Sequence, residues 1–151
     1  MPTHRFSLFP TALGHCGIAW GADARITGVQ LPDTTEAATR LVMQGRYPGC
    51  VETVRDGTLP APIAVAIAAI TALLAGHPTE PVNLTQLDLD MTPIPPFHQR
   101  VYALSRQMLP GETMTYGEMA RQLGEPGAAR AVGQALGANP FAPVVPCHRI
   151  L

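Results

Sequence analysis

Apolar and polar residues alternate along the N-terminal part of the chain in a way that favours strands. Residues 17–31, GIAWGADARITGVQL, predict two short strands around a turn at residues 21–23. On the second strand, Val29 and Leu31 alternate with polar Gln30, which is the two-residue period of a half-buried strand.

Two helices are expected after these strands. Residues 33–45, DTTEAATRLVMQG, predict a helix that Asp33 or Thr34 caps and that Gly45 stops. The apolar run 62–75 has a proline near its first turn and a glycine after its last, so it predicts a buried core helix. This run is too short to span a bilayer, which needs about 20 residues.

The pattern changes near residue 90, where helical spacing becomes dominant. Residues 97–109, FHQRVYALSRQML, predict a helix that Pro110-Gly111 stops. Its buried face is expected to carry the apolar residues at helical spacing, which are Phe97, Val101, Leu104 and Met108.

Two shorter helices follow, joined by a turn with the sequence EPGA. TYGEMARQLG begins with a capping box between Thr115 and Glu118 and ends at Gly124. ARAVGQALG predicts the second helix, with Gly137 just past its end. Two short helices around a tight turn form a helix-turn-helix, whose second helix enters a DNA groove. A plain helical hairpin fits the same pattern.

The second of these helices has an unusual composition for a DNA-reading helix. Its side chains are mainly those of Ala, Gly and Val, with one Gln and one charged residue, Arg130. Reading base edges in the major groove requires several Arg, Asn or Gln side chains. Small residues instead allow close approach to a shallow groove, where Arg130 is placed to act as a wedge beside a displaced base. Tight packing on a neighbouring helix is the alternative.

Composition indicates a globular chain with an uneven charge distribution. Of the 151 residues, 46% are hydrophobic, and the net charge is −1. Residues 1–95 carry five Arg against eight acidic residues, whereas residues 96–151 carry five Arg against three Glu. A site for a polyanion therefore belongs to the C-terminal third.

The three cysteines, Cys16, Cys50 and Cys147, do not form a disulfide framework, because they are odd in number and widely spaced. Free thiols suit a reducing compartment, and the N-terminus lacks the pattern of a secretory signal, so we expect an intracellular protein. Cys16 and Cys50 are expected to be small buried residues. A metal site built from these two cysteines with His4, His15 or His77 lacks the usual ligand spacing.

The C-terminal stretch NPFAPVVPCHRIL contains the most reactive candidate, Cys147 followed by His148. A thiol acts as a nucleophile in its thiolate form, which a nearby base favours. Residues adjacent on an extended strand point to opposite sides, so His148 would act through a turn or a bridging water. Taken alone, the dipeptide is equally consistent with a structural cysteine.

The whole stretch PGETMTYGEMARQLGEPGAARAVGQALGANPFAPVVPCHRI closely resembles the catalytic domain of O6-alkylguanine-DNA alkyltransferases. RAVG, NP and PCHR stand in the order and spacing of that family, and the resemblance is densest over residues 97–150. It implies an α+β fold: a small N-terminal α/β (ribonuclease H-like) domain over residues 1–80, a connection at 81–95, and a winged-helix-like helix-turn-helix catalytic domain at 96–151.

The resemblance also implies a direct-reversal DNA repair reaction with roles for individual residues. Cys147 would take the alkyl group from O6-alkylguanine, with O4-alkylthymine as a further candidate substrate, and His148 would assist its deprotonation through water. Tyr116 would donate a hydrogen bond to the departing guanine, Arg130 would fill the gap left by the flipped nucleotide, and Asn139 would hold the loop that carries PCHR.

Further residues are implied by position in the same motifs. The DNA-contacting set would include Arg130 and Tyr116 together with Thr115, Ala129, Ala131 and Gly133. The pocket for the base would be lined by Met114, Pro146 and Ile150.

No metal or diffusible cofactor is needed for this reaction, because a positioned thiolate and stabilisation of the leaving guanine suffice. The thioether product is a poor leaving group, so each molecule would react once. The expected partner is duplex DNA containing O6-alkylguanine, with no membrane and no obligate protein partner. We expect a cytoplasmic monomer, associated with the nucleoid in a prokaryote or nuclear in a eukaryote.

The sequence departs from the family pattern after PCHR. Family members continue with a Gly-Tyr-like segment and a final helix that supplies a glutamate to orient the histidine, so we expect a catalytic domain that is incomplete at its C-terminus, as in a fragment or a truncated form. Two other functions fit parts of the pattern. A non-catalytic lesion-binding relative would lack the reactive cysteine, and a cysteine hydrolase would leave Arg130 and the helix-turn-helix unexplained.

Overall fold

The computed structural model describes residues 4–53, 59–76, 84, 86–108, 111–146 and 150. The chain divides into two compact units, residues 1–90 and 91–151, which we call unit 1 and unit 2. Their boundary falls within the connection expected at residues 81–95. Among the described residues, no helix combines the length and the apolar character needed to cross a membrane.

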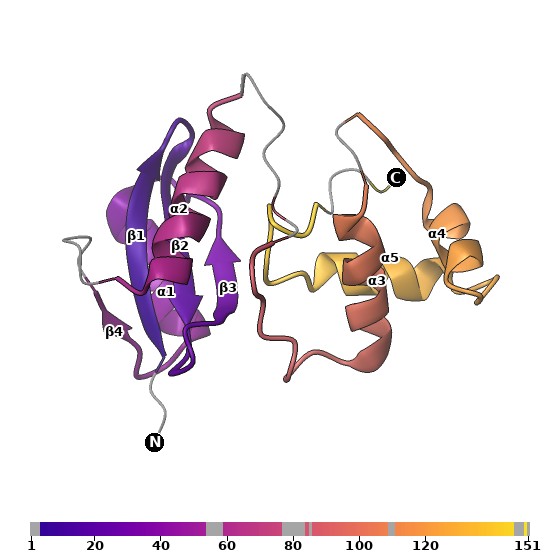
Figure 1. The fold of residues 1–151 in the computed structure, drawn as a ribbon, viewed down its shortest axis with the longest axis horizontal. Coiled ribbons are helices and arrows are strands. Elements are labelled where there is room, and N and C mark those ends of the chain that lie inside the picture. The colour runs from indigo at the N-terminus through magenta and orange to yellow at the C-terminus, as the bar shows by residue number, and fades with distance from the viewer. Residues whose placement is uncertain are drawn as a thin grey trace. The chain divides into compact units, whose positions relative to one another are not determined.

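Unit 1 contains a mixed sheet of four strands in the order β3-β2-β1-β4. Strand β1 (Arg5–Thr11) pairs antiparallel with β2 (Gly14–Trp20), which pairs antiparallel with β3 (Ile26–Gln30). Strand β4 (Val51–Glu52) pairs parallel with β1 at the other edge (Figure 1).

The two strands predicted around the turn at residues 21–23 are confirmed as β2 and β3. Leu31 lies outside β3 and is 37% exposed, so its predicted place in the strand was wrong. Part of the connection expected at residues 81–95 pairs with the sheet, because Ile26 exchanges backbone hydrogen bonds with Asp88 and Asp90. Residues 88–90 therefore extend the edge of the sheet beside β3.

Helix α1 (Glu36–Arg46) is present, but its ends differ from the prediction. The N-cap is Thr35, whose hydroxyl accepts the backbone N–H of Ala38 at 3.0 Å. The predicted caps, Asp33 and Thr34, both precede this N-cap, and Gly45 lies inside the helix. The last turn continues past Gly45 because the N–H of Tyr47 donates to the carbonyl of Met43.

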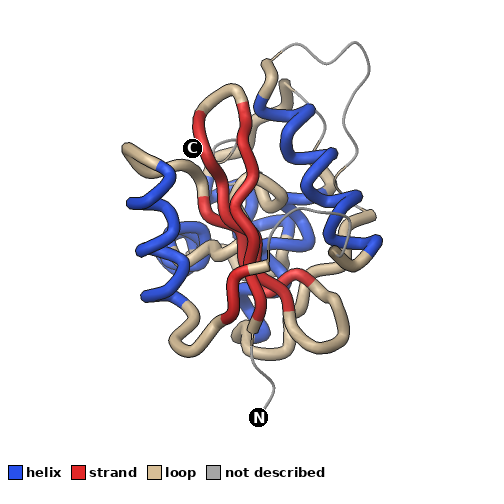
Figure 2. The backbone as a smooth tube through the Cα atoms, turned by 90° about the vertical axis from the view of Figure 1, so that its left-hand side faces the viewer, coloured by secondary structure: helices blue, strands red, loops and turns tan. Residues whose placement is uncertain are grey.

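Helix α2 (Ala61–Leu74) confirms the predicted buried helix, with Pro62 in its first turn and Gly76 after its end at a φ of 86°. Figures 1 and 2 show α1 and α2 on opposite faces of the sheet. Alternating strand residues therefore have a helix to pack against on either side. Phe6 of β1 packs with Met43 of α1, and five consecutive residues of β2 are buried: Cys16, Gly17, Ile18, Ala19 and Trp20.

Unit 2 consists of α3 (Pro96–Arg106), α4 (Tyr116–Gln122) and α5 (Ala129–Gly137), together with a parallel bridge between Met114 and Ile150. The predicted buried face of α3 is partly wrong, since Phe97 and Leu104 are only half-buried. Val101 and Met108 are buried as predicted, and the helix also turns Tyr102 and Ser105 inward. Spacing of apolar residues missed these two residues because both carry hydroxyl groups.

Candidate active site

The N-terminus of α4 holds the first predicted site residues. The capping box expected from the sequence is present: the hydroxyl of Thr115 accepts the N–H of Glu118 at 3.0 Å, and the N–H of Thr115 donates to the Glu118 carboxylate at 3.4 Å. Tyr116 is thus the first residue of a helix whose start is fixed from both sides. Its side chain is 38% exposed, so the phenol can reach a bound molecule.

Tyr116 lies against α5 at the position of Gly133. A Cβ atom placed on Gly133 would lie 3.4 Å from Cε2 of Tyr116. A larger side chain at this point would push the ring away from the helix. The structure therefore brings Tyr116 and Gly133 together. The family resemblance had named both as DNA-contacting residues, but nothing in the sequence indicated that they touch.

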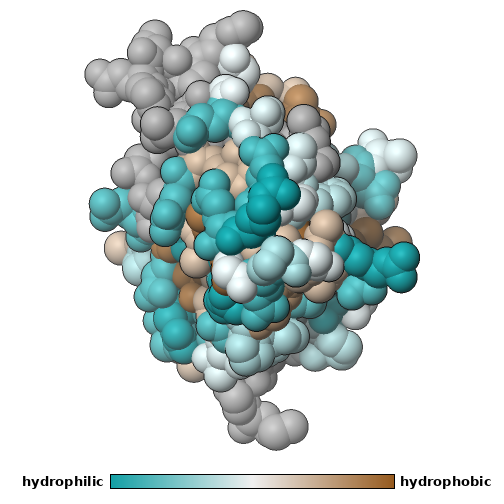
Figure 3. Space-filling model, turned by 90° about the vertical axis from the view of Figure 1, so that its right-hand side faces the viewer, coloured by the Kyte–Doolittle hydropathy of each residue, from teal (hydrophilic) through white to brown (hydrophobic). Residues whose placement is uncertain are grey.

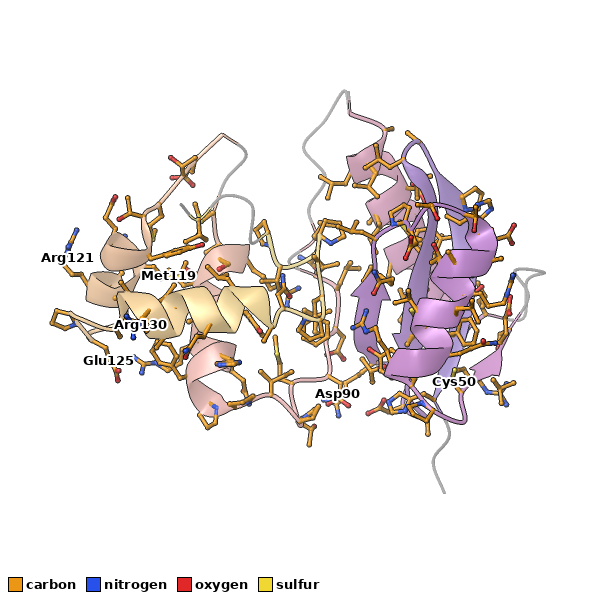
Figure 4. All side chains as sticks on the ribbon, turned by 180° about the vertical axis from the view of Figure 1, so that it is seen from behind. Cys50, Asp90, Met119, Arg121, Glu125 and Arg130 are labelled. Atoms are coloured by element: carbon orange, nitrogen blue, oxygen red, sulfur yellow. The ribbon has the colours of Figure 1, made fainter. Side chains whose placement is uncertain are left out.

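Helix α5 has one buried face and one exposed face, which carries Arg130, Gln134 and Gly137. Val132, Ala135 and Leu136 are buried, whereas Ala129, Ala131 and Gly133 are half-buried and Arg130 is exposed. Arg130 forms no salt bridge with any residue that the structure describes. Figure 4 places Arg130 near the beginning of α5, while Arg121 extends from α4. The surface seen from the side of α4 and α5 is mainly hydrophilic (Figure 3).

The predicted excess of positive charge is not all available for a ligand. Arg100 of α3 pairs with Glu125 at 3.3 Å and donates a hydrogen bond to the carbonyl of Leu123, the C-cap residue of α4. These bonds tie α3 to the turn between α4 and α5. This contact could not be predicted from the sequence, because a surface arginine with a distant partner has no local pattern.

Asn139 braces the segment that leads to the predicted nucleophile. Its side-chain amide donates to the carbonyl of Val145 at 2.8 Å, and its side-chain oxygen accepts the N–H of Phe141 at 2.9 Å. Both bonds lie inside the segment 139–146, whose Phe141, Val144 and Val145 are buried. Cys147 and His148 lie outside the described residues, and the role predicted for Asn139 in placing them stays a prediction.

Two of the three residues predicted to line the base pocket meet across a backbone bridge. Met114, just before α4, pairs with Ile150, which is 5% exposed. Pro146 is buried at the end of the segment braced by Asn139. Of the predicted pocket residues, Pro146 and Ile150 thus stand before and after Cys147 in the sequence, and Met114 stands just before α4.

The described cysteines have the properties of buried structural thiols. Burial raises the pKa of Cys16, against a weaker opposing effect of its hydrogen bond to Thr11, and burial also raises the pKa of the half-buried Cys50. A raised pKa disfavours the thiolate at neutral pH, so neither is suited to nucleophilic attack. No group of three or more His, Cys, Asp and Glu side chains able to hold a metal occurs in the described part of the chain.

Comparison with known proteins identifies the family. The family model for the 6-O-methylguanine DNA methyltransferase DNA-binding domain matches residues 96–151. A crystallised sequence variant of the Mycobacterium tuberculosis O6-methylguanine methyltransferase is 31% identical, with a TM-score of 0.68 over 99% of this chain and 79% of the other. The chain belongs to the methylated-DNA–protein-cysteine methyltransferase family.

Other family members support the assignment over both units. The Mycobacterium tuberculosis enzyme in complex with DNA has a TM-score of 0.71 and 28% identity, covering 97% of this chain and 78% of the other. The Mycobacterium leprae methylated-DNA–protein-cysteine methyltransferase is 46% identical over 99 residues, which are 64% of this chain and 57% of that protein. The protein from Salmonella typhimurium is 55% identical over 56 residues, or 37% and 33% of the two chains.

These comparisons confirm the predicted α+β fold with a helical DNA-binding domain at its C-terminal end. The chain spans about half the length of the curated relatives that it matches first, 57% and 53% of their residues. Its activity, substrate and partners are therefore argued as proposals.

Proposed function

We propose that this protein repairs duplex DNA by transferring an alkyl group from O6-alkylguanine to its own Cys147, once per molecule, with O4-alkylthymine as a further candidate substrate. The observation that carries the proposal is the extent of the family match, which covers residues 96–151 and so includes the PCHR motif with Cys147. Tyr116, Arg130 and Asn139 lie in the same matched region.

The proposed reaction is a single displacement at the alkyl carbon. The thiol proton leaves through water to His148, and the thiolate attacks the carbon attached to O6. The new sulfur–carbon bond forms as the carbon–oxygen bond breaks, and the departing electron pair remains on the guanine, which gains a proton at N1. Tyr116 would stabilise this developing charge by hydrogen bonding, since its phenol is held at the exposed start of α4.

The exposed face of α5 suits the binding of a duplex whose target base has been extruded. The small residues Ala129, Ala131 and Gly133 flank this face and permit a close approach to the sugar–phosphate backbone, and Arg130, exposed on it, is the one cation on that helix. Inserted beside the flipped nucleotide, its guanidinium would fill the gap and oppose the return of the base. We propose that the protein acts in this way as a monomer without a protein partner or cofactor, in the cytoplasm of a prokaryote, at the nucleoid, or in the nucleus of a eukaryote.

Intact-mass spectrometry tests the proposal directly. The wild-type protein, incubated with an excess of duplex containing O6-methylguanine, is expected to gain the mass of one methyl group, and peptide mapping should locate it on Cys147. The matched control is Cys147→Ser, whose hydroxyl is a far weaker nucleophile at neutral pH, so its mass should not change.

Three other outcomes would contradict the proposal in different ways. Tight binding of the lesion with an unchanged mass would indicate a lesion-binding protein. Repeated turnover of an ester or amide substrate would indicate a hydrolase. A methyl group mapped to Cys16 or Cys50 would show that the wrong thiol has been assigned.

A further inference from the structure

Tyr102 is a buried polar residue that no part of the proposed site uses. It lies on α3, and its side chain is 1% exposed. Its phenol donates a hydrogen bond of 2.6 Å to the carbonyl of Ala135, which is a residue of α5. A buried hydroxyl is costly unless it is bonded, so this contact fixes how the two helices meet.

The carbonyl that Tyr102 contacts is in the last turn of α5, where helical carbonyls lack the usual backbone donor. The N–H of Ala138 donates to Gln134, and the N–H of Asn139 donates to Leu136. The carbonyl between those two acceptors, that of Ala135, receives the phenol. Tyr102 thus supplies a partner that the chain leaving the helix does not.

The same aromatic ring also contacts the segment that follows α5. The rings of Tyr102 and Phe141 meet edge to face, with centroids 6.4 Å apart and planes at 87°. Phe141 is in turn bonded to the side chain of Asn139, and its carbonyl accepts the N–H groups of Val144 and Val145. One side chain of α3 therefore touches both the end of α5 and the core of the segment 139–146.

We infer that Tyr102 is a positioning residue that holds α5 and segment 139–146, which leads to Cys147, in a fixed position relative to each other. This inference rests on the proposed function, because the relative position of the two elements matters when α5 is bound to DNA. The extruded base must then reach the thiol across a distance that the protein sets. A free alkylated base carries no such constraint, since it can adjust its position without moving a duplex.

The test compares Tyr102→Phe with wild type in single-turnover reactions on two substrates. Phenylalanine keeps the ring against Phe141 and removes the hydroxyl that bonds Ala135. We expect the rate on a duplex containing O6-methylguanine to fall about fivefold, the effect of losing one hydrogen bond, while the rate with free O6-benzylguanine changes less than about twofold. Equal losses on both substrates, or no loss on duplex, would overturn the inference.

Ser105→Ala is the matched control. Ser105 is buried on the same helix, and its hydroxyl donates to the carbonyl of Val101 within α3, at 2.8 Å. Loss of this hydroxyl removes a buried hydrogen bond from α3 without touching α5. A general weakening of α3 would lower the duplex rate in both variants, whereas the inference requires a selective loss in Tyr102→Phe.

Hydrogen exchange gives a second readout that does not depend on activity. In Tyr102→Phe, the amides of Ala138, Asn139 and Phe141 should exchange about fivefold faster than in wild type, and Ser105→Ala should leave them unchanged. Unchanged exchange in Tyr102→Phe would overturn the inference even if wild type proved inactive. A wild type that transfers no methyl group would refute the proposed function alone, since the exchange result would still decide the role of Tyr102.

Discussion

At the scale of single residues, Asn139 shows how one side chain can organise a whole segment of the chain. It uses both ends of its amide, donating to Val145 and accepting from Phe141, and so closes the segment 139–146 on itself. Three prolines lie within or at the end of that segment and limit its backbone freedom. The combination constrains segment 139–146, which precedes Cys147 in the sequence.

Substitution of Asn139 separates its two hydrogen bonds. Asn139→Ala removes both, and we expect the free energy of unfolding of unit 2 to fall by about 2 kcal/mol, since each lost bond contributes about 1 kcal/mol. Asn139→Asp keeps an acceptor for the N–H of Phe141, but an ionised carboxylate cannot donate to Val145. We therefore expect the transfer rate of Asn139→Asp to be as low as that of Asn139→Ala. Its free energy of unfolding should nevertheless fall less than that of Asn139→Ala, because it keeps one of the two hydrogen bonds.

Methyl transfer measured by mass and hydrogen exchange over residues 141–145 would check this expectation. Faster transfer by Asn139→Asp than by Asn139→Ala would show that the bond to Phe141, and not the bond to Val145, positions the segment. Wild-type rates in both variants would remove Asn139 from the site altogether.

At the scale of helices and strands, the sequence predicted the caps, helix starts and turns that depend on neighbouring residues. The capping box of Thr115 and Glu118, the start of α2 at Pro62 and the turn between β2 and β3 depend on residues a few positions apart, and all are present. Strand β1 was not predicted. Its buried residues are Phe6, Ser7 and Phe9, and because Phe6 and Ser7 are adjacent, they face opposite sides of the sheet and the two-residue alternation is weak.

The candidate site shows the same division. The resemblance supplied the residues Tyr116, Arg130 and Asn139, because they stand in short motifs. The contacts made by Arg100 and Tyr102 could not be predicted, since each joins α3 to a partner between 23 and 33 positions away. Such bonds depend on how the helices cross, which periodicity does not specify.

The contact between α4 and α5 gives a prediction at this scale. Gly133→Val places a branched side chain where a Cβ already lies 3.4 Å from Tyr116, so the ring must move. We expect the transfer rate with free O6-benzylguanine to fall by about tenfold, part of the effect of a well-placed proton donor. Free base is the informative substrate because it does not depend on the DNA-binding face of α5.

Gly137→Val is the matched control on the same helix. A Cβ at Gly137 would have no other heavy atom within 4 Å, so its rate should stay within about twofold of wild type. Equal losses in the two variants would indicate a general effect of valine on α5. A normal rate in Gly133→Val would show that the position of Tyr116 against α5 does not govern the reaction.

At the scale of the whole molecule, the candidate chemistry belongs to unit 2, whereas the two cysteines that the structure describes belong to unit 1. Burial raises the pKa values of Cys16, Cys50 and Tyr47, all in unit 1. The single tryptophan, Trp20, is also in unit 1 and is 2% exposed. Its fluorescence therefore reports the unfolding of unit 1 without interference from other tryptophans.

The raised pKa values predict that unit 1 loses stability at alkaline pH. Near pH 7 both the folded and unfolded states keep these protons, so the stability is fully present. Above about pH 8.5 a cysteine in the unfolded chain loses its proton while the folded thiol retains it. The unfolded state then binds fewer protons than the folded state, and the free energy of unfolding falls as the pH rises toward the folded pKa.

Urea unfolding followed by Trp20 fluorescence should thus show a lower midpoint at about pH 10 than at about pH 7.5. Cys16→Ser is the matched variant, because its hydroxyl is similar in size and does not ionise in this range. The pH-dependent fall in its midpoint should be smaller than in wild type, since one of the raised groups has been removed. The same fall in both proteins would assign the alkaline sensitivity to Cys50 and Tyr47, and a midpoint independent of pH would contradict the role of burial in unit 1.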